Sequence, residues 1–155
     1  TGLINGASVG AVLNITEGIY DVVCNVRLVG VPAPELQVAI RQLHREYPGL
    51  TVIEDNSMGY AIRQGLDIPS YECEGFATTA QSKPRILGGL KVALQRQELK
   101  WSHAAYPELT EEMRGYQLDD KFIVQDCVMS LAIALDSAAQ AHLHEPGRII
   151  AVIQI

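Results

Sequence analysis

The stretch "VPAPELQVAIRQLHREYPGLTVIED", residues 31–55, passes from helical spacing to a short apolar strand. Its apolar residues first recur every three or four positions, with proline at the start, which is typical of an amphipathic helix. Pro48 and Gly49 end that pattern, and "LTVIE" follows as a strand. A helix that leads into a strand in this way is a crossover connection. We therefore predict that residues 50–54 form a central strand, parallel to a neighbour.

The segments on either side of this stretch predict an α/β domain. Residues 8–16 and 19–31 are rich in β-branched side chains, and Glu17-Gly18 between them suits a two-residue hairpin turn. Further helices are expected at residues 58–66, 82–97 (capped by Ser82), 106–116 and 121–145, and further strands at 70–75, 98–102 and 148–155. Because no linker or repeat interrupts this order, residues 1–155 are predicted to form one domain around a mixed sheet.

Composition and charge narrow the classes of function. The chain is 48% hydrophobic and 19% charged, and it shows neither a signal peptide nor a membrane-length apolar run, so we expect a soluble, intracellular protein without membrane partners. Its three cysteines are far apart, which favours buried thiols over a zinc site or a disulfide framework. The formal charge of -6 opposes general affinity for nucleic acid. Binding to DNA would need a local basic patch, a metal ion or another domain.

Glu54 and Asp55 stand at the end of the predicted central strand. Ligands of open α/β sheets bind beyond the carboxyl ends of the strands, so these acids are candidates for a site. Successive strand residues point to opposite sides, and we therefore expect one acid to face the site and the other to face solvent. Alternatively, Asp55, Asn56 and Ser57 merely cap the helix that follows.

Asp126 is the second candidate, because "FIVQDCVMSLAIAL" is apolar almost all round. A buried carboxylate costs several kcal/mol unless a charge or a metal pairs with it. The alternative is an aspartate in the first turn of a helix, stabilised by the helix dipole. Two carboxylates from distant segments suit Mg²⁺, which prefers oxygen ligands, and paired ions of this kind promote phosphodiester hydrolysis.

Several segments, in this order, resemble the C-terminal nuclease domain of the large terminase subunit of tailed bacteriophages. They are the hairpin, "PAPELQVAIRQLHREYPGLTVIEDNSMGYAIRQGL", "TTAQSKPRILGGLKVALQRQELKW", "YPELTEEMRGY" and "DDKFIVQDCVMSLAIAL". The resemblance covers nearly the whole chain and ends around Ala139, and its most specific pieces are "VIEDNSMG" and "QDCVMSLAIAL". The resemblance implies an RNase H-like fold, in which a mixed central sheet with an antiparallel hairpin is flanked by helices. It also implies cleavage of concatemeric double-stranded viral DNA, with Mg²⁺ or Mn²⁺ in a two-metal site held by three acidic positions.

Transferred residue by residue, the resemblance places the second acid at Glu54, with Asp55 as the alternative, and the third at Asp126. The first acid matches Asn5, which is a poor ligand for Mg²⁺. Three explanations stay open: a substituted or truncated chain whose first acid would precede Thr1, a naturally weakened site, or recruitment of Asp119 or Asp120.

Lys83 and Arg85 begin the most basic segment of the chain, and we hypothesise that they contact DNA phosphate; the alternative is an ordinary solvated helix face. The resemblance implies double-stranded DNA, a terminase ATPase domain, the small terminase subunit and the portal as partners, in the host cytoplasm. Two other functions remain under consideration, namely an RNase H-like Holliday-junction resolvase and a catalytically silent RNase H-like docking module.

Overall fold

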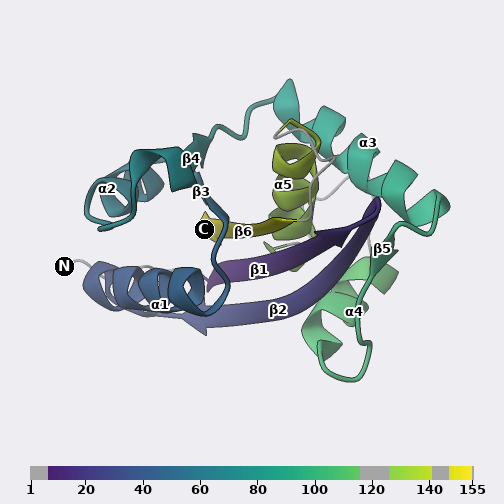
Figure 1. Ribbon diagram of the computed structural model, residues 1–155, viewed down its shortest axis with the longest axis horizontal. Coiled ribbons are helices and arrows are strands. Elements are labelled where there is room, and N and C mark those ends of the chain that lie inside the picture. The colour runs from purple at the N-terminus through teal and green to yellow at the C-terminus, as the bar shows by residue number, and fades with distance from the viewer. Residues whose placement is uncertain (1–6, 116–125, 141–146, 155) are drawn as a thin grey trace.

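A computed structural model of the protein describes residues 7–115, 126–140 and 147–154, the last five of these by their backbone alone. It is an α/β structure built on one six-stranded mixed sheet (Figure 1), with the strand order β4-β3-β6-β1-β2-β5. The strands are β1 (Ala7–Thr16), β2 (Ile19–Val29), β3 (Leu50–Glu54), β4 (Cys73–Phe76), β5 (Leu99–Lys100) and β6 (Gly147–Gln154). The helices are α1 (Ala33–Glu46), α2 (Ser57–Gln64), α3 (Ser82–Gln95), α4 (Pro107–Arg114) and α5 (Asp126–Gln140).

The predicted hairpin is confirmed. Strands β1 and β2 pair antiparallel up to Thr16 and Ile19, and the turn between them consists of Glu17 and Gly18. Both turn residues have positive φ, 52° and 76°, as a type I′ turn requires. This turn matches the right-handed twist of the strands, so the local sequence specifies the hairpin and its register near the turn. A bulge between Val12 and Leu13 shifts the register farther along the strands.

The prediction for residues 50–54 is also confirmed. Strand β3 lies between β4 and β6 and is parallel to both. Strand β6 in turn pairs antiparallel with β1, so the last strand of the chain lies in the interior of the sheet and joins the hairpin to the parallel strands.

The helices cover the two faces of the sheet. Buried residues of α3, α4 and α5 pack with the alternate residues Val9, Ala11, Leu13 and Ile15 of β1 in one cluster. Residues of α1 and α2 pack with Val12 and Ile53 in a second cluster. Because neighbouring residues of a strand point to opposite faces, the two clusters lie on opposite sides of the sheet. We call them the α5 face and the α1 face (Figure 1).

Two local expectations need correction. Residues 70–72 form a 3-10 turn before β4 and do not belong to the strand. Ser82 is the first residue of α3 and not its N-cap, and its hydroxyl donates to the carbonyl oxygen of Ala77.

Among the described residues, no helix is long and apolar enough to span a bilayer. The cysteines are free thiols, as expected, with Cys73 and Cys127 buried and Cys24 half-buried.

Candidate functional site

The turn after β3 holds the backbone of Glu54 in place. The side chain of Asn56 caps α2 by accepting a hydrogen bond of 2.6 Å from the backbone N–H of Gly59. Gly59 is buried against Glu54, and a Cβ at Gly59 would collide with the carbonyl oxygen of Glu54. The backbone N–H of Asp55 donates to Phe76 on β4 at 2.6 Å. The segment "EDNSMG" is therefore both a helix cap and a device that fixes the last residue of the strand.

Glu54 and Asp55 point to different surroundings, as predicted. The carboxylate of Asp55 pairs with the guanidinium of Arg63 on α2 at 3.3 Å and is partly exposed. Glu54 is half-buried, and its Oε2 atom is shielded from solvent. Of the two acids, Asp55 lies at the surface in an ion pair, and Glu54 is the more buried.

Strand register places Glu54 on the α5 face. Ile53 pairs with Val152, so Glu54 lies beside Ile153, which pairs with Val9 of β1. Val9 in turn pairs with Arg27 of β2, which completes one row across the sheet. Side chains in one row share a face, so Glu54 and Arg27 lie on the α5 face at the same end of the sheet. Three strand spacings separate their backbones, about 14 Å.

Asp126 begins α5 at this same end. Its side chain is only 10% exposed, and its Oδ2 atom lies 3.8 Å from a guanidinium nitrogen of Arg27. Burial raises the pKa of the Asp126 carboxyl, and the charge of Arg27 opposes that shift. The predicted buried carboxylate is confirmed, and the structure supplies a counter-charge that the sequence pattern did not indicate.

Glu112 is a third carboxylate at this place. Its Oε1 atom accepts hydrogen bonds from the backbone N–H groups of Cys127 at 2.9 Å and Val128 at 3.3 Å. Burial raises the pKa of Glu112 above its ordinary value, the hydrogen bonds from Cys127 and Val128 oppose that shift, and the charge of Asp126 adds a smaller increase. Sequence reasoning missed this residue because α4 is mostly polar. The spacing of residues could have indicated its burial. Glu112 follows the buried Leu109 by three positions, so the two share one face of the helix.

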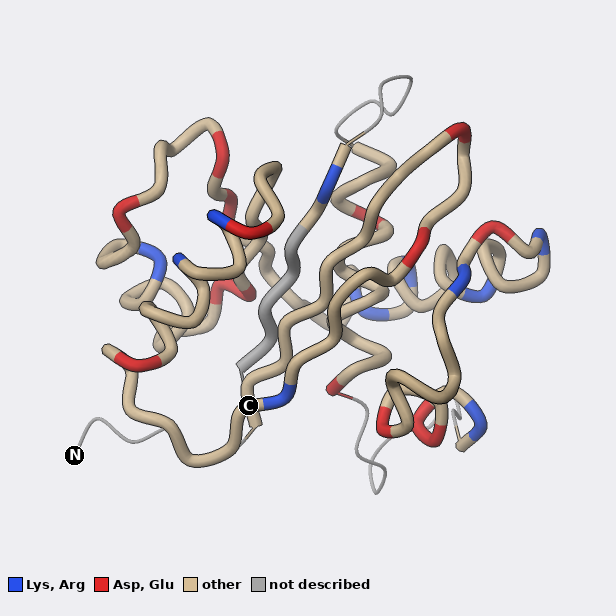
Figure 2. The backbone as a smooth tube through the Cα atoms, turned by 60° about the horizontal axis from the view of Figure 1, so that its bottom comes forward, with Lys and Arg blue, Asp and Glu red and all other residues tan. Residues whose placement is uncertain are grey.

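The predicted phosphate-binding residues lie elsewhere on the α5 face. The guanidinium of Arg85 pairs with the carboxylate of Asp136, which links α3 to α5. Asp136 is almost three turns beyond Asp126, about 15 Å along the helix. Lys83 is half-buried in the first turn of α3. The charged positions of α3 are all basic, and those of α5 are all acidic, while β1 carries no charge (Figure 2). A role for Lys83 and Arg85 in DNA binding stays a prediction.

Asn5, Asp119 and Asp120 lie outside the described residues. Within the described ranges, no group of three or more His, Cys, Asp or Glu side chains is gathered closely enough to hold a metal ion. The described residues of the candidate site are Glu54, Arg27 and Asp126, at one end of the α5 face. Of these, Asp126 is the one that contacts Arg27, and Glu112 supports the first turn of α5 beside it.

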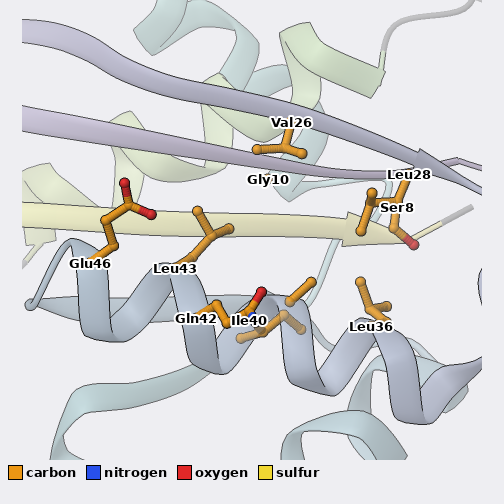
Figure 3. Close-up of a pocket in the computed structure, with 10 residues that line it drawn as sticks. Ser8, Gly10, Val26, Leu28, Leu36, Ile40, Gln42, Leu43 and Glu46 are labelled. Carbon is orange, nitrogen blue, oxygen red and sulfur yellow. The ribbon is translucent and has the colours of Figure 1, made fainter.

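A cavity of about 270 Å³ lies on the opposite face, between α1 and the hairpin (Figure 3). Its lining is mainly aliphatic, with Leu36, Ile40 and Leu43 of α1 facing Val26 and Leu28 of β2. Because the sheet separates this cavity from Asp126, it is not part of the carboxylate site.

Comparison with protein-family models and with curated proteins gives no match to this chain.

Proposed function

We propose that this chain is a divalent-metal-dependent DNA endonuclease domain with an RNase H-like fold, which cuts double-stranded DNA by two-metal phosphodiester hydrolysis. The observation that carries the proposal is the placement of Glu54 and Asp126 at the same end of the same face of a mixed sheet. These two residues come from segments far apart in the sequence, and both are candidates for metal binding on their sequence pattern alone.

The chemistry of the available donors fits Mg²⁺ or Mn²⁺. Carboxylate oxygens are the ligands that these hard cations prefer, and such sites leave other positions to water and phosphate. Asp126 is buried, yet its described counter-charge lies at 3.8 Å, which is longer than a charge-assisted hydrogen bond. A divalent cation would compensate a carboxylate that Arg27 neutralises only in part.

In this proposal Glu54 and Asp126 would hold the cations, and the cations would supply Lewis acidity for hydrolysis of the phosphodiester. The contribution of the protein is to hold these two carboxylates in position. The capped turn at Asn56 and Gly59 holds Glu54, and α5 holds Asp126 in a largely dehydrated position. Arg27 is the described cation closest to Asp126, where it would favour an approaching phosphate.

The resemblance to terminase nuclease domains extends the proposal to viral DNA packaging. The partners would then be a terminase ATPase domain, the small terminase subunit and the portal, and the place of action the host cytoplasm. The missing first acid is proposed to be supplied by Asp119 or Asp120, or by a residue that precedes Thr1.

Nicking of supercoiled plasmid tests the activity. We expect the chain to nick DNA with Mg²⁺ or Mn²⁺ and not with EDTA, and Glu54→Ala and Asp126→Ala each to lower the rate by at least about 100-fold. Asp55→Ala is the matched control, because Asp55 pairs with Arg63 and should leave the rate within a few-fold.

Three results would contradict the proposal. Loss of nicking in Asp55→Ala but not in Glu54→Ala would show that the wrong acid has been assigned. A protein that neither nicks DNA nor binds Mn²⁺ at millimolar concentration would favour the silent docking module. Selective cleavage of branched over linear DNA would favour the junction resolvase.

A further inference from the structure

The first turn of α5 is held by a residue from another helix. The first backbone N–H groups of a helix have no partner within the helix and need an acceptor from outside it. Here the acceptor is Glu112 of α4, whose Oε1 atom receives the N–H groups of Cys127 and Val128. A carboxylate at this position also complements the positive end of the helix dipole.

A second contact ties the same turn to the sheet. The thiol of Cys127 lies 3.6 Å from the Oδ1 atom of Asn25 on β2. Cys127 is fully buried, so its side chain is confined by its neighbours in the core. The residue directly before Cys127 is Asp126, and its backbone is therefore held between α4 and β2.

The position of Asp126 is fixed from two sides. Glu112 of α4 accepts hydrogen bonds from the N–H groups of the two residues that follow Asp126, and Asn25 of β2 contacts the thiol of Cys127. The carboxylate of Asp126 is only 10% exposed and lies 3.8 Å from Arg27. A carboxylate supported in this way would keep one orientation toward a bound cation.

We propose that Glu112 is a positioning residue, which fixes the first turn of α5 and so orients the carboxylate of Asp126 toward a bound divalent cation. This inference rests on the proposed function. Removal of a group that orients a metal ligand typically lowers metal affinity or activity by roughly 10- to 100-fold. Glu112 acts through the backbone of α5 and not by direct contact with the substrate.

The test compares Glu112→Ala with Glu112→Gln, using Mn²⁺ as the probe. Glutamine keeps an oxygen that can accept both N–H groups, whereas alanine removes the acceptor. We expect Glu112→Ala to lower Mn²⁺ affinity, measured by electron paramagnetic resonance, and plasmid nicking by about tenfold or more. Glu112→Gln should restore both to within a few-fold of the wild type. Glu111→Ala is the matched control, because the exposed Glu111 bonds only its own helix neighbour Arg114 among the described contacts.

A second measurement does not depend on metal or activity. Amide hydrogen exchange at Cys127 and Val128 should be faster in Glu112→Ala than in the wild type and slow again in Glu112→Gln. Equal exchange in wild type and Glu112→Ala would overturn the inference, as would normal Mn²⁺ affinity in Glu112→Ala. A defect in Glu112→Gln as large as in Glu112→Ala would also overturn it, because the charge itself would then be required. A wild-type protein that neither binds Mn²⁺ nor nicks DNA would instead contradict the proposed function. The exchange rates would then still show whether Glu112 holds the first turn of α5.

Discussion

Asp126 agrees with both interpretations that its sequence pattern allows. Its position at the start of α5 agrees with an aspartate favoured by the helix dipole, and its burial agrees with a carboxylate that needs a partner. Arg27 of β2 supplies part of that charge from a distant segment of the chain. The dipole and the ion pair act in the same direction, so the local interpretation does not exclude a functional one.

Cys24 provides a prediction at the level of single residues. Burial raises the pKa of its thiol, and the nearby charge of Glu46 raises it further, so less thiolate is present at neutral pH. We expect slow alkylation of Cys24 by iodoacetamide at pH 7, with a rate that increases up to and beyond pH 9. Glu46→Gln should lower the pKa and accelerate the reaction modestly, and this gain should shrink in 1 M salt. Mass spectrometry of the modified peptide gives the rate, and an unchanged rate in Glu46→Gln at low salt would contradict the assigned cause.

At the level of elements, the segment after β3 is a cap and a candidate site at once. Asn56 caps α2, as the structural alternative predicted, and the same turn holds Glu54 at the end of the strand. The two functions are compatible because the cap uses the amide of Asn56, while strand register places Glu54 on the α5 face. Gly59 makes the close approach possible, since no other residue type lacks a Cβ.

Gly59→Ala tests this dependence. The added Cβ would collide with the carbonyl oxygen of Glu54, so the turn must move. We expect the free energy of unfolding to fall by about 1–3 kcal/mol, as in other overpacked sites, and DNA nicking to fall with it. Urea denaturation measures the first effect and the plasmid assay the second.

Gly88→Ala in α3 is the control for this substitution. A Cβ at Gly88 would have no neighbour within 4 Å, and alanine is the better helix former by about 1 kcal/mol. Stability should therefore rise in Gly88→Ala and fall in Gly59→Ala. The opposite order would show that the contact between Gly59 and Glu54 does not constrain the turn.

At the level of the whole molecule, the sheet is held together by its last strand. Strand β6 pairs with β1 on one side and β3 on the other, so it joins the hairpin to the parallel strands. The same strand completes the row that places Glu54 and Arg27 on one face. The geometry of the candidate site therefore depends on a segment that contributes none of its predicted residues.

Ala151→Pro tests the importance of β6. Ala151 pairs with Ala11 on one side and Val52 on the other, so proline removes a ladder hydrogen bond in the interior of the sheet. We expect a loss of about 3 kcal/mol or more in the free energy of unfolding, measured by urea denaturation. Val29→Pro, at the exposed last residue of β2, should cost much less. Equal losses in the two variants would mean that β6 is not an interior strand in solution.

Much of the fold could be predicted from local patterns. The hairpin turn, the crossover helix, the strand at residues 50–54 and the separation of Glu54 from Asp55 all depend on residues close in the sequence. The misplaced ends at residues 70–72 and Ser82 reflect loop hydrogen bonds that apolar periodicity does not describe. For the site, the sequence indicated Glu54 and Asp126 but neither Arg27 nor Glu112.

The sequence by itself determined the elements and the two carboxylates, because hydrophobic period, turn chemistry and a charge on an apolar helix are local properties. Only the tertiary structure decided that β6 separates β3 from β1 and that Glu54 and Asp126 share a face. It alone also decided that Arg27 and Glu112 each contact the first turn of α5. The physical reason is that these features depend on pairing and packing between segments far apart in the chain, and no pattern within one segment specifies which distant partner it meets.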